Sequence, residues 1–185
     1  MVSRAEAAVM LHTMLTQELQ VDPPPVLAEY PIENTDGVFL NDYLLELQRV
    51  PDPILQAFCE LGWSYHIDCA YLAQMSERLD MTCIGAAVYS EERIYVSEAG
   101  ATLHEFGHFL DYTLDFPDTH QALYEAESEA AARLMRNYSK TNSREFFADC
   151  FAYWIRNHDN LEKFKTELPA TAAYFEQLET GNWCE

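Results

Sequence analysis

The sequence contains no run of about 18 consecutive apolar residues, the length that a helix needs to cross a bilayer. Residues 1–15 also lack a basic segment followed by a continuous apolar segment, so no signal peptide is visible. We therefore expect a soluble protein, cytoplasmic by default and secreted if a leader has been removed.

Basic residues are scarce as well. Lysine and arginine number 11 against 31 aspartates and glutamates, which gives a formal net charge of −20. A chain this acidic repels phosphate backbones and anionic lipid surfaces, so neither nucleic acid nor a membrane is an expected partner. The five cysteines are odd in number and contain no CxxC pair, which indicates free or buried thiols.

Apolar and aromatic side chains are plentiful, at 49% and 13% of the 185 residues, so the chain can bury a sizeable core. We expect one domain over residues 1–185, and a monomer. Its two lobes are expected over residues 1–98 and 99–185.

Hydrophobic periodicity and turn residues predict an α+β fold, with a small mixed sheet in the N-terminal lobe and a mostly helical C-terminal lobe. In the N-terminal lobe, helices are predicted over residues 3–20, 38–49 and 52–62, and strands over 63–68, 83–89 and 93–96. Residues 69–82 carry no pattern that predicts a structure. In the C-terminal lobe, helices are predicted over residues 102–114, 118–137, 144–157, 160–167 and 171–179.

The stretch around His104 and His108 contains the motif HExxH, with Glu105 between the two imidazoles. Helical spacing places both histidines one turn apart on the polar arc of the helix, so both can bind one Zn²⁺ while Glu105 lies beside the metal as a base. Thr102 and Glu105 have the spacing of a capping box and are predicted to begin this helix. The alternative of two buried core histidines is weakened by their place on the polar arc.

Two histidines leave a catalytic zinc site one protein ligand short. The metzincin pattern is excluded, because Asp111 and Leu114 stand where its glycine and third histidine would be. His120 follows a proline break and is a weak candidate. The glutamates of the helix that follows are expected to form a solvated face: Glu125, Glu127 and Glu129.

Glu145 is the favoured third ligand. It lies at the start of a helix that Asn142 or Ser143 is predicted to cap, and Asp149 follows one turn later on the same face. Such a pair can give one carboxylate to zinc and the other to the far ring nitrogen of a ligand histidine, which fixes the tautomer of that histidine.

The segment from Tyr138 to Phe151, taken together with the HExxH motif, resembles the catalytic domain of anthrax lethal factor and its relatives, which include the Pro-Pro endopeptidases. The resemblance covers residues 99–154. It is specific because two separate blocks agree, including the step of seven residues from Tyr138 to Glu145.

This resemblance implies a gluzincin-like zincin domain and a zinc-dependent endopeptidase, with one Zn²⁺ per chain and a peptide or protein as substrate. It implies that His104, His108 and Glu145 are the zinc ligands, that Glu105 is the general base toward a zinc-activated water, and that Tyr138 donates to the oxyanion. The 99–185 lobe would then bind the zinc. Asp149 departs from the glutamate that is expected in the family, so the resemblance supports its role less than those of the ligands.

Small residues, Gly85, Ala86 and Ala87, fill the strand that precedes the HExxH helix. If this strand lies at a sheet edge, an extended peptide can pair with its backbone in antiparallel direction and cross the zinc with its scissile bond. The alternative is that these small residues pack beneath the helix, and the pattern alone favours neither. Gly107, inside the helix, is interpreted as a point of close approach by a neighbouring segment.

Two other functions stay open at this stage: a catalytically inactive zinc-binding interaction module of a lethal factor-like toxin family, and a zinc hydrolase for a non-peptide bond. For specificity, the Pro-Pro endopeptidases imply proline on both sides of the cut, whereas lethal factor implies a basic segment upstream. The run Asp22–Pro25 is expected to be extended and resembles a proline-type substrate, so self-cleavage there is a hypothesis.

Overall fold

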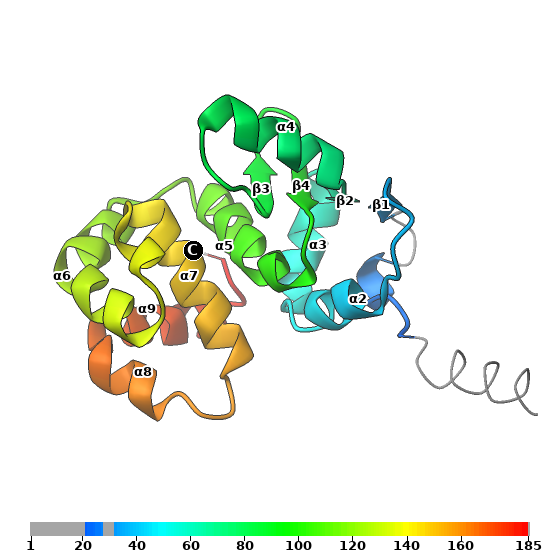
Figure 1. The fold of residues 1–185 in the computed structure, drawn as a ribbon. Helices are drawn as coiled ribbons and strands as arrows, with labels where there is room; N and C mark the ends of the chain where they lie inside the picture. The colour runs from blue at the N-terminus through cyan, green and yellow to red at the C-terminus, as the bar shows by residue number, and fades with distance from the viewer. Residues whose placement is uncertain (1–20, 28–31, 185) are drawn as a thin grey trace, which may run out of the picture.

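The computed structural model describes residues 21–27 and 32–184, and it confirms an α+β fold that is mostly helical with a small mixed sheet (Figure 1). The helix predicted over residues 3–20 lies outside these residues. In Figure 1 the sheet and α4 lie on one side of α5, and the helices from α6 to α9 lie on the other.

The elements up to the sheet hairpin are η1 (Pro25–Leu27), β1 (Glu33–Asn34), α2 (Asn41–Leu47), α3 (Asp52–Glu60), β2 (Ser64–Ile67), α4 (Cys69–Leu79), β3 (Gly85–Val88) and β4 (Arg93–Val96). The elements after it are η2 (Ala99–Ala101), α5 (Thr102–Thr113), α6 (Asp118–Leu134), η3 (Asn137–Lys140), α7 (Ser143–Arg156), α8 (Glu162–Glu167) and α9 (Pro169–Thr180). Within the part of the chain that the structure describes, no helix is long and apolar enough to span a membrane.

The strands pair in the order β1-β2-β4-β3. β2 runs parallel to both β1 and β4, whereas β3 runs antiparallel to β4. The three predicted strands are confirmed as β2, β3 and β4. β3 is therefore the edge strand of the described sheet on the side of α5, which it contacts.

Residues 69–82, for which no structure was predicted, contain α4. Asp68 caps this helix by accepting a hydrogen bond from the Tyr71 N–H at 2.8 Å, and Asp80 ends it in a left-handed conformation with φ 52°. The helix buries Leu72 and stacks the ring of Tyr71 on Tyr95 of the sheet, with ring centroids 3.8 Å apart. Leu72, Met75 and Leu79 do recur at helical spacing, so a pattern that predicts this helix was present and was missed.

The proline run is not extended throughout its length, as the sequence had suggested. Pro25–Leu27 forms the turn η1, which packs against α3 and buries Leu27. The self-cleavage hypothesis therefore concerns a segment whose end is packed against α3, and it stays a hypothesis.

The capping box predicted at Thr102 is wrong. The helix follows directly from the turn η2, its N-cap is Ala101, and no side chain caps it. The Thr102 hydroxyl instead shares a buried hydrogen bond of 2.7 Å with the Tyr65 hydroxyl. The cap predicted at Asn142 is confirmed: its side-chain oxygen accepts from the backbone N–H groups of Arg144 and Glu145, both at 3.0 Å.

The polar arc of α5 is buried rather than solvated. Asp111 is 1% exposed and His108 is 9% exposed, because α7 covers this face of the helix. A Cβ atom added at Gly107 would lie 2.7 Å from the Ala148 Cα atom of α7. The glycine thus allows the two helices to approach closely, as the sequence predicted, and this contact brings the start of α7 beside the HExxH motif.

Glu127 is also buried, although the sequence placed it on a solvated face. Its carboxylate accepts hydrogen bonds from the backbone N–H groups of Ala170 and Thr171, at 2.9 and 3.0 Å, and from the Thr171 hydroxyl at 2.6 Å. It therefore satisfies free N–H groups at the start of α9, where a negative charge is favourable.

Candidate metal centre

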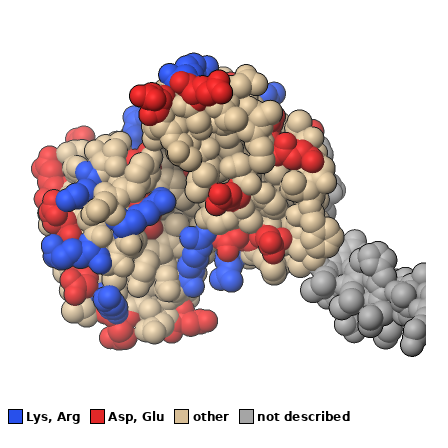
Figure 2. All heavy atoms as spheres, viewed as in Figure 1, with Lys and Arg blue, Asp and Glu red and all other residues tan. Residues whose placement is uncertain are grey.

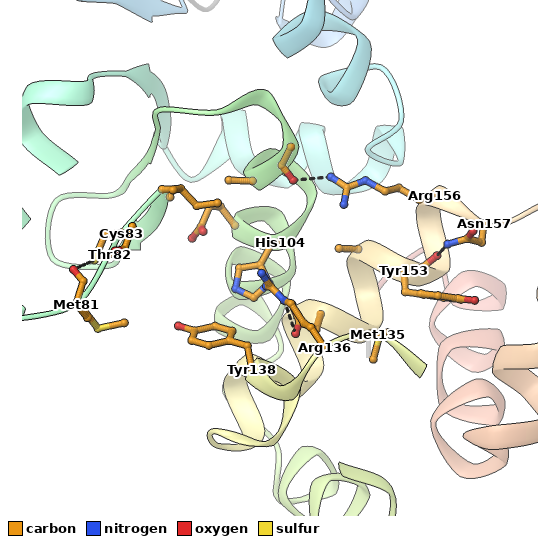
Figure 3. Close-up of a pocket in the computed structure, with 17 residues that line it drawn as sticks. Met81, Thr82, Cys83, His104, Met135, Arg136, Tyr138, Tyr153, Arg156 and Asn157 are labelled. Carbon is orange, nitrogen blue, oxygen red and sulfur yellow. Dashed lines mark hydrogen bonds and ion pairs between the residues drawn. The ribbon is translucent and has the colours of Figure 1, made fainter. Parts of the chain in front are cut away.

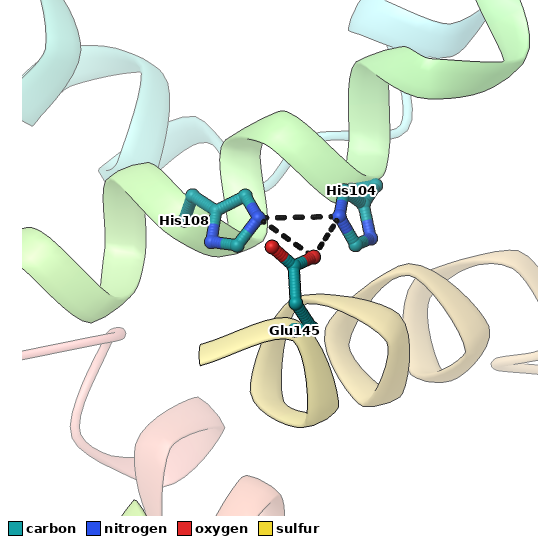
Figure 4. Close-up of side chains that lie close together, drawn as sticks. All are labelled: His104, His108 and Glu145. Atoms are coloured by element: carbon teal, nitrogen blue, oxygen red, sulfur yellow. Dashed lines mark hydrogen bonds and ion pairs between the residues drawn. The ribbon is translucent and has the colours of Figure 1, made fainter. Parts of the chain in front are cut away.

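Three side chains from two helices converge at the contact between α5 and α7 (Figure 4). The Nε2 atoms of His104 and His108 lie 3.2 Å apart, and the Glu145 Oε2 atom lies 3.0 Å from the first and 3.3 Å from the second. The two imidazoles come from successive turns of α5. Glu145 is fixed opposite them, because Asn142 caps the first turn of α7.

These separations fit one small divalent cation. Two ligands that are each about 2.0–2.1 Å from a tetrahedral Zn²⁺ lie about 3.3 Å from one another. Two imidazole nitrogens and one carboxylate oxygen are also a donor set that zinc prefers in catalytic sites, with one position left for water or substrate. The described residues therefore suit zinc by both donor type and spacing.

Asp149 holds the second nitrogen of His104. Its Oδ1 atom lies 2.8 Å from His104 Nδ1, and its Oδ2 atom accepts from the Ser139 hydroxyl at 2.7 Å. Arg136 donates to both oxygens of the same carboxylate. When Asp149 accepts the Nδ1 proton, the Nε2 lone pair of His104 points toward Glu145 and the place of the cation.

His108 has no such support. Its Nδ1 atom is buried and has no hydrogen-bond partner among the described residues. The two histidines are therefore held unequally, and the orientation of His104 is the one that the protein specifies by hydrogen bonding.

The charges of the metal-free site show how strongly it favours a cation. Burial acts to lower the pKa of His104, but hydrogen bonds to Asp149 and Glu145 outweigh it and raise the pKa to about 9. Burial acts to raise the pKa of Glu145, but the two histidines hold that pKa far below its usual range. A proton on His104 thus takes the place that a metal ion would fill.

Glu105 lies in the same turn of α5, on the side of the sheet. Its carboxylate accepts a hydrogen bond from the Ala87 N–H of β3, and burial raises its pKa. A Cβ atom added at Gly85 would lie 2.4 Å from Glu105 Oε1. The small residues of β3 therefore make room for the carboxylate, so the suggested packing beneath the helix does occur at Gly85.

The free edge of β3 faces the same place. The carbonyl of Ile84 accepts from the Ser97 N–H at 2.9 Å, and the carbonyl of Val88 accepts from the Glu91 N–H at 3.1 Å, so both point toward the partner strand. Because backbone groups alternate along a strand, those of Gly85 and Ala87 point away from β4. β3 therefore does both things that the sequence left open: it has a free edge that a peptide can pair with, and its small residues pack against Glu105.

Tyr138 stands on the other side of His104, in η3. The two rings have centroids 6.1 Å apart. Burial and the nearby carboxylate of Glu145 raise the pKa of Tyr138 to about 12, so its phenol is a hydrogen-bond donor at neutral pH.

A pocket of roughly 500 Å³ opens beside these groups (Figure 3). The loop before β3 forms one wall, and η3 and α7 form the opposite wall. His104, Arg136 and Tyr138 lie together at its centre in Figure 3, and Arg156 lies at the end toward η2. The Arg156 guanidinium hydrogen-bonds to the Glu46 carboxylate at 2.7 Å and to the Gly100 carbonyl.

The structure brings together the suggested residues of the two helical blocks, with Gly85 and Ala87 of β3 against Glu105: His104, Glu105, His108, Tyr138, Glu145 and Asp149. Ala86, between Gly85 and Ala87, pairs with Tyr95 of β4. The structure keeps His120 apart: this side chain pairs with Asp111 at 2.6 Å and Tyr174 at 3.0 Å, away from the metal centre. Arg136 and Ser139 were not suggested. Arg136 lies outside the motifs, and Ser139 lies in the Tyr138–Phe151 segment without a suggested role, so only their contact with Asp149 in three dimensions identifies them.

Comparison with known proteins gives two findings. The family model for the anthrax toxin lethal factor, N- and C-terminal domain, matches residues 71–178. The solved structure of a Pro-Pro endopeptidase from Paenibacillus alvei is similar with a TM-score of 0.63, at 14% sequence identity, over 84% of this chain and 99% of that chain. At this identity the likeness shows a shared fold. Comparison with curated proteins gives no match.

Proposed function

The chain belongs to the family of the anthrax toxin lethal factor N- and C-terminal domain, and from this premise we propose that it is a zinc-dependent endopeptidase. Membership of the family supports a metallopeptidase type of function. The finer assignment, which has His104, His108 and Glu145 as ligands of one Zn²⁺ and Glu105 as the general base, is our proposal.

The observation that carries it is the convergence of two imidazole nitrogens and a carboxylate oxygen, 3.0–3.3 Å apart, with a buried carboxylate and a protonated phenol on either side. Structural metal sites are filled by four protein ligands, whereas this set leaves a position open. The base and the phenol would have no purpose in a purely structural site.

Zinc held by these side chains would lower the pKa of a water molecule to about 7 and polarise the scissile carbonyl. Glu105 accepts the proton of the attacking water and passes it to the leaving amine. In the metal-free chain, burial raises the pKa of Glu105 toward neutral pH, where a group can both take and return a proton. Tyr138 donates a hydrogen bond to the developing oxyanion.

The substrate would lie along the free edge of β3, with its backbone antiparallel to Gly85–Ala87. The outward backbone groups of Gly85 and the Ala87 carbonyl supply the pairing, while the Ala87 N–H holds Glu105. This arrangement favours a peptide over other substrates that zinc could hydrolyse, because only an extended backbone matches the strand.

The pocket indicates which side chains the substrate offers. Apolar side chains form much of the lining: Met81, Ile84, Met135, Ala152 and Tyr153. Its cations are Arg136 and Arg156, and its acids are Glu105 and Asp149 at the metal centre. Figure 2 shows acidic and basic side chains spread over the surface, with several basic ones beside the hollow in its centre. We infer that a proline or another apolar side chain enters this pocket, rather than a lysine or arginine.

A peptide library tests the function. Zinc-loaded protein is incubated with the library, with and without a chelator, and the products are read by mass spectrometry. We expect cleavage that stops on chelation and resumes when zinc is restored, with lysine and arginine selected against at one position beside the cut. Bound zinc without cleavage of any peptide would contradict the proposal and favour the inactive interaction module.

A further inference from the structure

Arg136 makes more contacts within the metal centre than any role so far explains. Its Nε atom lies 3.0 Å from both carboxylate oxygens of Asp149, and its Nη2 atom bonds to Asp149 Oδ1 and lies 3.2 Å from His104 Nδ1. Its guanidinium carbon also lies 5.0 Å from the centroid of the Tyr138 ring. One side chain thus touches the carboxylate behind a ligand, the ligand itself and the proposed oxyanion donor.

Asp149 needs such a partner. It is 5% exposed, and an ionised carboxylate is costly to bury unless hydrogen bonds and an opposite charge compensate it. Aspartate also carries its carboxylate on a single methylene group. A short carboxylate reaches His104 Nδ1 only when its plane is held in one orientation.

We propose that Arg136 is a positioning residue, which fixes the Asp149 carboxylate against His104 and thereby sets the affinity of the site for zinc. This inference rests on the proposed function, because it takes His104 to be a zinc ligand. Arg136 touches neither the place of the metal nor the reacting atoms, and it acts through Asp149.

The geometry explains why this residue is an arginine. A guanidinium is planar and rigid, and it can hold both oxygens of one carboxylate at once, whereas a lysine ammonium is a single flexible point charge. Here the fork spans Oδ1 and Oδ2 of Asp149 while Ser139 holds Oδ2 from the other side. The carboxylate therefore has no free rotation, and Oδ1 stays directed at His104.

Arg136 lies half exposed at the wall of the pocket, so a purely structural role as a surface ion pair has to be considered. Surface pairs typically contribute about 0–1 kcal/mol, and their loss changes the stability of the whole fold rather than the affinity for a metal. The two roles therefore predict different measurements.

The test measures zinc affinity in a double-mutant cycle, by competition with a chelator of known affinity. We expect Arg136→Met to weaken zinc binding about 10-fold, within the range seen when partners of metal ligands are lost. Asp149→Asn should weaken it by at least as much. In the Asp149→Asn background, adding Arg136→Met should change the affinity by less than about 2-fold, because the anionic carboxylate that Arg136 holds against His104 is gone.

Arg133→Met is the matched control. Arg133 lies on the last turn of α6, is exposed, and makes no hydrogen bond or ion pair with the described residues. Its loss should leave zinc affinity unchanged. Arg136→Lys retains the charge without the fork, and it keeps the test open if Arg136→Met does not fold. We expect zinc affinity several-fold below wild type for this variant.

Wild-type zinc affinity in Arg136→Met or Arg136→Lys would overturn the inference. So would a double variant whose loss of zinc affinity equals the product of the losses in Arg136→Met and Asp149→Asn. These results would leave the proposed function intact. Failure of the wild-type chain to bind zinc would overturn the metal centre itself, so the two failures are distinguishable.

Discussion

The contact between Gly85 and Glu105 leads to a sharp prediction, because one methyl group added to β3 should move the general base without touching a metal ligand. A Cβ atom at position 85 would lie 2.4 Å from Glu105 Oε1 and 2.9 Å from its Cδ and Cγ atoms. Real contacts of this kind are not shorter than about 3 Å, so the carboxylate has to retreat by at least about half an ångström.

A displacement of about 1 Å in a catalytic group lowers rates by as much as about 100-fold. For Gly85→Ala we therefore expect kcat to fall between about 10-fold and 100-fold, which corresponds to about 1.4–2.7 kcal/mol of transition-state stabilisation. The end of a flexible side chain yields before a strand or helix does, so the fold should be retained. His104, His108 and Glu145 are untouched, so zinc should stay at one ion per chain.

The assay compares kcat, zinc content and thermal stability of Gly85→Ala with those of Gly100→Ala. A Cβ atom added at Gly100, which lines the same pocket, would meet no atom within 4 Å, so any change there should be confined to KM. Full kcat in Gly85→Ala would refute the placement of Glu105 as the base. Loss of zinc would show that the change had disturbed the whole site.

Three further changes test other parts of the structure. Glu145→Ala should lower the zinc content sharply, measured per chain after dialysis, and stoichiometric zinc would move the third ligand elsewhere. Gly107→Ala should lower the free energy of unfolding, measured in urea, by about 1–3 kcal/mol, because the new methyl group meets the backbone of α7. This loss outweighs the gain of about 1 kcal/mol in helix propensity. Unchanged stability would show that the helices can separate freely. The pKa of His104 is about 9 in the folded, metal-free protein and about 6.5 in the unfolded chain. Protonation of His104 therefore adds about 3 kcal/mol to the free energy of unfolding below about pH 6.5, and this stabilisation is lost as the pH rises through 9. Urea denaturation of the zinc-free protein at pH 6.5 and at pH 9.5 measures this loss of stability. If the double variant Glu145→Ala, Asp149→Asn shows the same loss, the pH dependence belongs to other groups.

The sequence predicted those parts of the site that depend on local spacing. His104 and His108 share a face because helical geometry puts residues four apart on one side, and Asn142 caps α7 because its side chain reaches the next N–H groups. Gly107 marked the close approach of α7 before the partner helix was known. The first two signals lie within a few residues of their effects, whereas Gly107 indicated a close approach without indicating which segment makes it.

Features that depend on distant partners escaped prediction. Arg136 and Ser139 meet Asp149 only because the turn η3 folds back over α7, and Glu127 is buried only because the start of α9 reaches it. Thr102 has the pattern of a capping box, yet Tyr65 of the sheet competes for its hydroxyl. α4 is different: Leu72, Met75 and Leu79 recur at helical spacing, so this helix could have been predicted from the local sequence.

The most direct test of the central proposal is the cleavage rate of Glu105→Gln on a substrate found in the peptide library. The amide has nearly the same shape as the carboxylate but cannot accept the proton of the attacking water. The variant should keep one zinc ion per chain and lose about 10²–10⁴-fold in kcat. Cleavage at the wild-type rate, with zinc still bound, would remove Glu105 from the mechanism and contradict the proposed function.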